Sequence, residues 1–406
     1  MNKRYLPVIV SFLLGLGVMA APVADQDAQL QKRAAQLHRE ALVIDTHCDT
    51  PMAMLRGLDI GALQNRNEVD LRRMKAGGVD AMFFAVFVSN SRDRRHPARH
   101  AMEMIDAIVS QVNAYPDRAA PATSCADILR LHKEGRRAIL MGMENGGPLE
   151  GSLRLLRQYY RLGVRYITLT HNSHNDICDS STQTPPVWNG LSLFGREVVE
   201  EMNRLGMIID ISHVSDAAFY DVVRLSRAPV MASHSCVRAI CDVPRNLSDD
   251  MIRALAGNGG VIQVNFYSAF LDPDFAARLR AVHERLAPKI AALRKGYADN
   301  DNAFWSAAFD LWRKNVPQPP DIDILVDHID HVVKLVGIEH VGLGSDFDGA
   351  GSFPVGLEDV SGFPRITLAL LKRGYTDREI RLILGENFMR VFARVEEVSA
   401  ALKTKS

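Results

Sequence analysis

Side chains that bind metal ions or transfer protons follow six short apolar runs of this chain. Imidazole and carboxylate groups together hold divalent ions while leaving a coordination position open for water. Gathered at one end of a sheet, these groups would form a hydrolytic metal centre. In chain order they are His47 with Asp49, Glu144, His171, His213, His234 and Asp346.

Eight apolar runs of strand length supply the elements that must position these side chains. Segments with helical periodicity separate the runs, and strands alternating with helices imply parallel pairing with right-handed crossovers. Eight such units predict a (β/α)8 TIM barrel, an α/β fold whose metal site lies at the C-terminal ends of the strands. The runs are 43–44, 81–88, 139–140, 166–169, 207–209, 229–231, 260–267 and 341–343.

The length and charge of the chain limit its organisation and its partners. With 406 residues, 47% of them hydrophobic, residues 21–406 suit one barrel domain. Residues 272–320 are too long for a simple loop and predict a helical excursion after the seventh strand, which either covers the site or packs peripherally. Since 48 basic and 48 acidic residues cancel, no global field favours nucleic acid or anionic membrane. We therefore expect a small partner.

The first residues predict export. Lys3 and Arg4 precede an apolar stretch, 6–18, and the small residues Ala20 and Ala21 follow it, which is typical of a secretory signal peptide over 1–20. The alternative is an uncleaved membrane anchor, but the stretch is shorter than the ~20 residues that a spanning helix needs. In a Gram-negative host we expect a periplasmic protein with no stable membrane anchor after signal cleavage.

Five cysteines occur in the chain, so at least one is free or pairs between chains. Cys48 directly follows His47 and should point to the opposite face of its strand. Cys236 lies beyond the end of its strand. We therefore expect both to lie away from the metals. The remaining three are Cys125, Cys178 and Cys241.

The spacing of the candidate ligands predicts two ions. His47 and Asp49 stand two apart on a strand, so their side chains share a side and can bind one ion. Glu144 has two carboxylate oxygens that can bridge ions ~3.5 to 4 Å apart. His213 and His234 end the fifth and sixth strands and would complete the shell of the second ion.

In these motifs the chain resembles the renal, or membrane, dipeptidase family of zinc metallopeptidases. The resemblance extends from about Leu42 to Val395 and keeps the motifs in order. It implies two zinc ions, one bound by His47 and Asp49, the other by His213 and His234, with Glu144 bridging. The motifs are 45–49, Glu144, 169–171, 211–213, 233–235 and 344–349.

The resemblance also assigns His171, Arg245 and Asp346 to catalysis and substrate binding, with dipeptides as substrates. A hydroxide bridging two ions can attack a peptide carbonyl, with His171 stabilising the oxyanion. Asp346 would carry the proton from nucleophile to leaving amine. Arg245 would hold the free carboxylate, because a guanidinium fork suits a carboxylate better than an ammonium does. Asp348 and Arg238 are the competing candidates for these last two roles. Asp348 stands two residues after Asp346, so strand geometry would send both side chains to the same side.

Two other functions stay open. One is another amidohydrolase-type reaction on cyclic amides or bases, although those enzymes often bridge their ions with a carboxylated lysine and no lysine ends a strand here. The other is an inactive exported protein that binds small peptides. A homodimer is also open. We interpret His174 as a loop residue, and His328 and His331 as lying on the exposed face of a helix over 323–336.

Overall fold

The computed structural model describes residues 23–90, 95–297 and 300–404. The predicted signal segment, 1–20, therefore lies outside the described residues. Among the helices that are described, none combines the length and the apolarity needed to cross a membrane.

Eight parallel strands form the predicted (β/α)8 barrel, in the order in which they occur along the chain. A ninth strand, β3 (Ala119–Pro121), pairs with β4 outside this path. The fold prediction is confirmed. The barrel strands are β1 (Ile44–Cys48), β2 (Ala81–Phe87), β4 (Arg137–Glu144), β5 (Val164–Thr168), β6 (Ile208–Asp210), β7 (Met231–Ser235), β8 (Val261–Val264) and β9 (Val341–Leu343).

The barrel closes through the residues that follow β9, not through a ladder between β9 and β1. Cys48 and Phe347 form a parallel bridge. The backbone N–H of Asp346 donates to the carbonyl of His47 at 3.1 Å, and the N–H of Asp49 donates to the carbonyl of Phe347 at 2.8 Å. This closure brings the first and last candidate motifs together.

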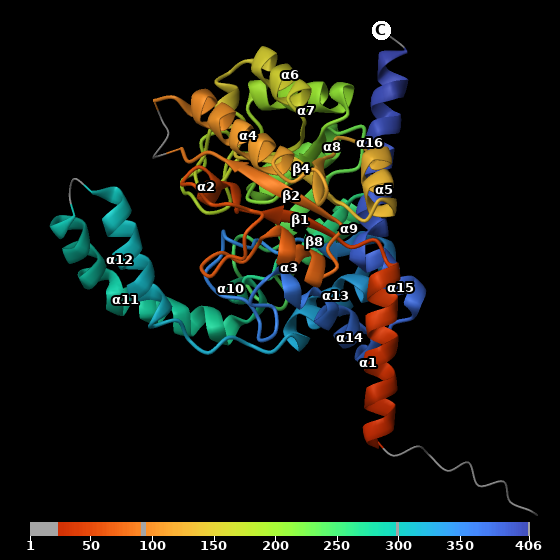
Figure 1. The fold of residues 1–406 in the computed structure, drawn as a ribbon. Coiled ribbons are helices and arrows are strands. Elements are labelled where there is room, and N and C mark those ends of the chain that lie inside the picture. Colours follow the sequence, from red (N-terminus) through yellow and green to blue (C-terminus); the bar gives the residue numbers. More distant parts are fainter. Residues whose placement is uncertain (1–22, 91–94, 298–299, 405–406) are drawn as a thin grey trace, which may run out of the picture.

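Helices surround the strands, and serines begin several of them (Figure 1). The hydroxyls of Ser124, Ser192, Ser215 and Ser248 each accept a hydrogen bond from a backbone N–H of the first helical turn. Each such cap contributes ~1 kcal/mol. The outer helices are α1 (Val23–Glu40), α4 (Pro97–Asn113), α5 (Cys125–Lys133), α6 (Leu153–Arg161), α7 (Leu193–Leu205), α8 (Asp216–Leu225), α9 (Asp249–Gly257), α13 (Asp323–Val336) and α14 (Phe363–Arg373), with short helices α2 (Pro51–Met54) and α3 (Leu71–Ala76).

Alternation along the strands divides the core in two. Outward side chains pack against the surrounding helices, while Phe83 and other inward side chains form a second cluster with Phe388 and Phe392 of α16 (Asn387–Lys403). The rings of Phe83 and Phe388 meet edge to face at 5.4 Å. Helix α16 therefore packs outside the strands and also covers their amino ends. A short helix, α15 (Asp377–Arg381), precedes it.

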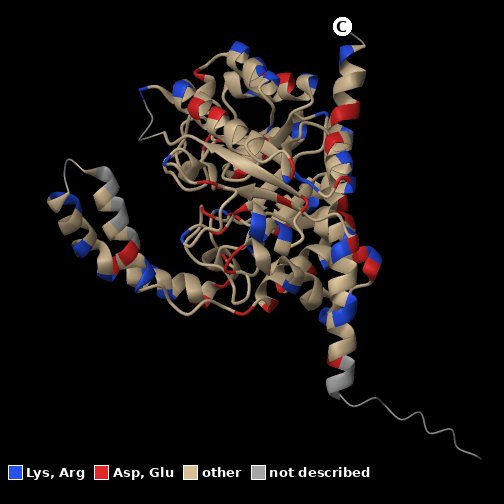
Figure 2. Cartoon of the chain, viewed as in Figure 1, with Lys and Arg blue, Asp and Glu red and all other residues tan. Residues whose placement is uncertain are grey.

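Beyond β8 the chain forms α10 (Ser268–Leu271), α11 (Pro273–Gly296) and α12 (Asp301–Arg313). Helices α11 and α12 make a hairpin that projects from the body of the barrel (Figure 1). Blue and red segments are interspersed over the drawn chain, in keeping with its zero net charge (Figure 2).

The placement of His328 on the exposed face of its helix is wrong. The ring is buried, its Nδ1 lies 3.0 Å from the N–H of Val237, and its Nε2 lies 2.9 Å from the carbonyl of Leu271. Both ring nitrogens find backbone partners, so burial leaves no polar atom unsatisfied. His331 is half-buried and contacts Asp249 at 2.7 Å.

Candidate metal centre

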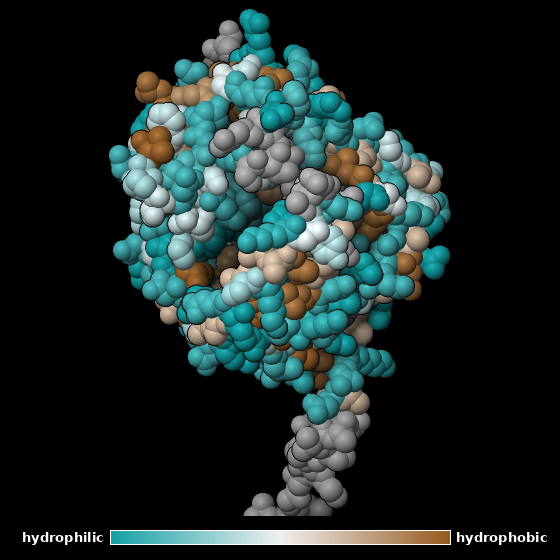
Figure 3. Space-filling view, turned by 90° about the vertical axis from the view of Figure 1, so that its left-hand side faces the viewer, coloured by the Kyte–Doolittle hydropathy of each residue, from teal (hydrophilic) through white to brown (hydrophobic). Residues whose placement is uncertain are grey.

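The candidate ligands meet in one pocket at the carboxyl ends of the strands. The pocket has a volume of about 270 Å³, and Asp49, Glu144, His171, His213 and Asp346 line it. Figure 3, viewed from the side of the projecting hairpin, shows a hollow in this face of the molecule. Residues that are up to 299 positions apart in sequence, from 47 to 346, therefore share one site.

Glu144 ends β4 and divides its two carboxylate oxygens between two groups of ligands. Its Oε2 lies 3.5 Å from Nε2 of His47. Its Oε1 lies 3.1 Å from Nε2 of His213 and 3.6 Å from Nε2 of His234. This is the arrangement of a carboxylate that bridges two ions.

His47 and Asp49 form the first group. Nε2 of His47 lies 3.4 Å from Oδ2 of Asp49 and 4.0 Å from Oδ1 of Asp346. Two atoms of this group, His47 Nε2 and Asp49 Oδ1, are buried without a hydrogen-bond partner among the described residues. Buried polar atoms of a folded protein are nearly always satisfied, so these atoms fit a bound ion.

His213 and His234 form the second group, with their Nε2 atoms 2.9 Å apart. Burial, with Arg245 and the neighbouring histidines adding to it, holds the pKa of both rings well below the ordinary value. Neutral rings present lone pairs, which is the form that coordinates metal ions. Both groups therefore fit a divalent metal in donor type, and the second group also fits it in protonation state.

Groups behind the ligands orient them, and the sequence alone did not single these out. The hydroxyl of Tyr166 lies 2.7 Å from Nδ1 of His47. A side chain at Gly142 of the adjacent strand would overlap the Tyr166 ring, so that glycine makes room for it. Partners of this kind fix the ring orientation of metal-binding histidines. The only sequence signal was a hydroxyl-bearing residue within an apolar run.

A second chain of contacts supports His234. Its Nδ1 lies 2.7 Å from the Ser233 hydroxyl, which in turn donates to Asp210 at 2.6 Å. Asp210 ends β6 and also accepts from the N–H of Ser212 at 3.0 Å. The sequence signal for Asp210 is an acidic residue at the end of an apolar run.

His171 lies beyond the end of β5 and faces Glu144, and Asp346 lies beyond the end of β9 and faces His47. Nε2 of His171 lies 3.6 Å from Oε1 of Glu144, and burial lowers the pKa of this ring to about 4. Burial, together with Asp49, raises the pKa of Asp346 to about 6 against the opposing effect of His47. Asn265 donates to Oδ2 of Asp346 at 2.9 Å. A neutral donor and a carboxyl that titrates near neutrality suit oxyanion stabilisation and proton transfer.

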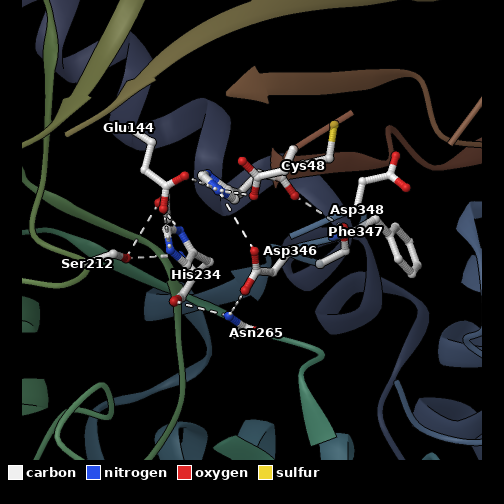
Figure 4. Close-up of polar contacts among 12 residues, drawn as sticks. Cys48, Glu144, Ser212, His234, Asn265, Asp346, Phe347 and Asp348 are labelled. Atoms are coloured by element: carbon white, nitrogen blue, oxygen red, sulfur yellow. Dashed lines mark hydrogen bonds and ion pairs between the residues drawn. The ribbon is translucent and has the colours of Figure 1, made fainter. Parts of the chain in front are cut away.

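Asp348 does not compete with Asp346, because its carboxylate is used elsewhere (Figure 4). It accepts from the Thr50 hydroxyl at 2.6 Å and from the N–H of Glu68 at 2.8 Å. The expectation that residues two apart share a side fails here, since β9 ends at Leu343. Asp346 and Asp348 both have a φ of 64° instead of strand geometry.

Left-handed backbone also occurs at His213, whose φ is 69°. Such a conformation costs a residue other than glycine of order 1–3 kcal/mol and persists only where the surroundings impose it. The strained positions His213 and Asp346 each lie three residues beyond a barrel strand, β6 and β9, and line the pocket. The backbone conformation at these two positions therefore lowers the stability of the fold and directs both side chains to the site.

Arg245 lines the pocket, whereas Arg238 does not. Arg245 is only 5% exposed, its guanidinium donates to the carbonyl of His234 at 3.1 Å, and its Nε has no partner among the described residues. Burial lowers its pKa. Arg238 instead donates two hydrogen bonds of 2.7 Å to Asp216. Of the two candidates, Arg245 alone is available to an anionic substrate.

Cys48, Cys236 and His174 lie where the sequence predicted them. The Cys48 side chain points away from the ligands (Figure 4), and Sγ of Cys236 faces the carbonyl of Asn265 at 3.2 Å. All five cysteines are free. His174 lies in the loop after β5, where its Nδ1 accepts from the N–H of Ser180 at 2.9 Å.

A barrel with two neutral histidines, a further histidine and a carboxylate between them at its mouth is typical of metal-dependent hydrolases. Comparison with known proteins identifies the family. Residues 31–406 match the model of the membrane dipeptidase family, peptidase family M19, and the chain belongs to that family of peptide-bond hydrolases.

Relatives agree with this assignment. Dipeptidase 3 of Mus musculus is 34% identical over 383 residues, covering 92% of this chain and 68% of the mouse protein. The crystal structure of the probable dipeptidase PvdM from Pseudomonas aeruginosa covers 91% of this chain and 99% of its own, with 30% identity and a TM-score of 0.80. A metallopeptidase from Rhodobacter sphaeroides, liganded with a phosphinate mimic of L-Ala-D-Ala, covers 87% and 99%, with 25% identity and a TM-score of 0.72.

Proposed function

We propose that this chain is a zinc dipeptidase that binds two Zn²⁺ ions and hydrolyses dipeptides with a free carboxyl terminus. The observation that carries the proposal is a buried guanidinium in the same pocket as the divided Glu144 carboxylate. A charge-assisted pair between Arg245 and a carboxylate would satisfy the guanidinium and limit how far the substrate extends beyond the metals. His47 and Asp49 would hold one ion and His213 and His234 the other.

When bound, the two ions supply an acidified water as nucleophile and polarise the scissile carbonyl. Asp346 accepts a proton from the nucleophile and delivers it to the leaving amine, a role that suits its pKa of about 6. His171 is neutral and donates from its ring to the developing oxyanion. Asn265 orients Asp346 through the bond to Oδ2.

The substrate range includes dipeptides with a carboxyl-terminal D-residue. This part of the proposal is supported by the Rhodobacter sphaeroides relative, whose bound ligand mimics L-Ala-D-Ala. Zinc-loaded protein should therefore hydrolyse both L-Ala-L-Ala and L-Ala-D-Ala. Amine release from each, followed in parallel, measures the preference.

The decisive experiment compares Arg245→Ala with the parent protein on L-Ala-L-Ala and on its carboxyl amide. The parent should cleave the amide far less well, because the amide lacks the charged partner of the guanidinium. The variant should lose most activity on the free dipeptide and little on the amide. Equal losses on both substrates would show that Arg245 does not read the carboxylate.

Metal dependence is tested separately by chelation and by analysis of bound metal. Chelated protein should lose activity and regain it with Zn²⁺, with two ions per chain at saturation. Full activity of the metal-free protein would rule out the zinc mechanism. Bound peptide without turnover, in the presence of zinc, would instead indicate an inactive peptide-binding relative.

We further propose that the chain is exported and resides in the periplasm of a Gram-negative host after cleavage near Ala20. The proposal rests on the charged start, the apolar stretch 6–18 and the small residues that follow. N-terminal sequencing of the protein from fractionated cells tests it. An intact Met1 terminus in the membrane fraction would instead indicate an anchor. Sedimentation of the purified protein distinguishes a monomer from a homodimer.

A further inference from the structure

A second cavity of about 400 Å³ lies beside the metal pocket, between the projecting hairpin and the barrel mouth. Leu279 and His283 of α11 and Trp312 of α12 line it on one side, with Val316 just beyond α12. Tyr267 and Gly351 line it on the other side, and these two residues also line the metal pocket. The two cavities therefore share a wall.

The shared wall is open at Gly351. A Cβ atom built at this position would meet no heavy atom within 4 Å, so the space above the backbone is empty. A group that passes Gly351, which lines both cavities, therefore meets no side chain at this position.

Beside its polar lining residues, the second cavity offers apolar surface that can contact a flat group. The polar lining residues are Asn65, Arg66, Glu68, Arg313 and Ser352. The rings of Trp312 and His283 meet edge to face with centroids 4.2 Å apart, which holds the indole against α11. Leu279 is buried and Val316 is half-buried, so aliphatic carbon covers part of the remaining wall. Aromatic side chains of a ligand gain most from such surroundings, through burial and through edge-to-face contacts.

The position of Arg245 indicates which end of a dipeptide reaches this cavity. The guanidinium carbon lies 5.4 Å from the centre of the Phe270 ring, and that ring meets Tyr267 edge to face at 4.9 Å. A carboxylate bound by Arg245 therefore lies on the side of the site that Tyr267 borders. The side chain of the carboxyl-terminal residue, next to that carboxylate, is the part of the substrate nearest the wall that the two cavities share.

We propose that the cavity between the hairpin α11–α12 and the barrel mouth binds an aromatic side chain of the carboxyl-terminal residue and makes the enzyme prefer such dipeptides. Trp312 is the specificity-determining residue. The inference rests on the proposed dipeptidase function and deepens it by assigning a substrate class.

The test compares kcat/KM for L-Ala-L-Phe, L-Phe-L-Ala and L-Ala-L-Ala on zinc-loaded enzyme. L-Ala-L-Phe should exceed L-Ala-L-Ala by about tenfold, and L-Phe-L-Ala should show no comparable gain. In Trp312→Ala the ratio of L-Ala-L-Phe to L-Ala-L-Ala should fall to about one, since the aromatic wall is lost. A ratio that does not change in Trp312→Ala, or a gain on L-Phe-L-Ala instead, would overturn the proposal.

Tyr297→Ala is the matched control. Tyr297 is an aromatic residue that follows α11 on the same hairpin, is 38% exposed, and does not line the cavity. This variant should keep both the rate and the ratio of the parent. A fall in the ratio equal to that of Trp312→Ala would show that the hairpin acts through its stability and not through the cavity.

A binding measurement separates failure of this inference from failure of the proposed function. Phosphinate analogues of L-Ala-L-Phe and L-Ala-L-Ala contain no indole, so a change in protein fluorescence on binding reports the three tryptophans of the chain. The phenylalanine analogue should change the fluorescence of the parent but not that of Trp312→Phe. If no dipeptide is hydrolysed, the proposed function fails, and this measurement alone decides the cavity assignment. An identical response in both proteins would overturn it.

Discussion

The two ends of the barrel bury side chains equally well but of opposite chemistry. At the amino end, Phe83, Phe388 and Phe392 form a cluster with exposures of 0%, 2% and 0%. At the carboxyl end, His47 and Glu144 are 0% and 3% exposed. Burial of each aromatic side chain stabilises the fold by roughly 1.5–3 kcal/mol. Burial at the other end opposes the ionisation of Asp49 and raises its pKa to about 6.

This difference assigns stability to one end and chemistry to the other, as expected for a barrel of this type. Burying a titratable group without enough hydrogen-bond partners lowers the stability of a protein, and such groups occur mainly at functional sites. Left-handed backbone at His213 and Asp346 adds strain at the same end. Substitutions at the two ends should therefore have separable effects.

The largest effect is expected at the metal end. Glu144→Gln removes the charge that faces both ligand groups, so both ions should be lost and kcat/KM should fall on the order of 1,000-fold. The thermal midpoint of the metal-free protein should change little, because glutamine keeps the size of the glutamate side chain and can still hydrogen-bond to the neighbouring histidines. Metal analysis, activity and thermal unfolding measure the three quantities. Retention of two ions would break the proposed bridging role.

The amino end should respond in the opposite way. Phe392→Ala leaves a cavity where α16 covers the strands, and the free energy of unfolding should fall by about 3–5 kcal/mol. The zinc content and kcat of the folded protein should stay near those of the parent. Phe392→Leu, as the milder control, should cost less than ~3 kcal/mol. A large loss of kcat in either variant would show that the two ends are coupled.

Within the metal end, Asp346→Asn separates binding from chemistry. We expect kcat to fall roughly 100-fold with two ions still bound. The carboxylate form of Asp346 is the base, so the activity of the parent should rise with pH through about 6, where this group titrates. The variant should lose that acidic limb. Loss of an ion would make Asp346 a ligand, and an unchanged rate would move the proton-transfer role to another residue.

The smallest effect is expected at an ion pair beside the amino end. Asp80, whose Oδ1 lies 3.2 Å from Nδ1 of His132, raises the pKa of that ring above 6.5. A raised pKa contributes stability that is present below 6.5 and is lost as the pH rises through the folded value. His132→Gln should therefore cost roughly 0.5 kcal/mol in mildly acidic buffer and nothing in alkaline buffer. Unfolding of both proteins at the two pH values measures the difference, and a pH-independent difference would contradict the assignment.

Local patterns in the sequence predicted the barrel and the residues at its mouth. Apolar runs reveal strands without knowledge of their neighbours, and His47 and Asp49 share a side because β1 continues through Cys48. The same reasoning failed for Asp346 and Asp348, because the residues after β9 leave strand geometry. It also failed for His328, whose burial depends on carbonyl and N–H groups of other elements.

The sequence by itself determined the order of elements, the family and the residue types that end each strand, because these are properties of short segments. Only the tertiary structure decided which oxygen of Glu144 faces which histidines, which arginine is free for a substrate, and that Trp312 borders a cavity next to Tyr267. These outcomes are distances between residues far apart in the chain. They are set by closure of the barrel and by the packing of the hairpin against its mouth, and no local pattern encodes them.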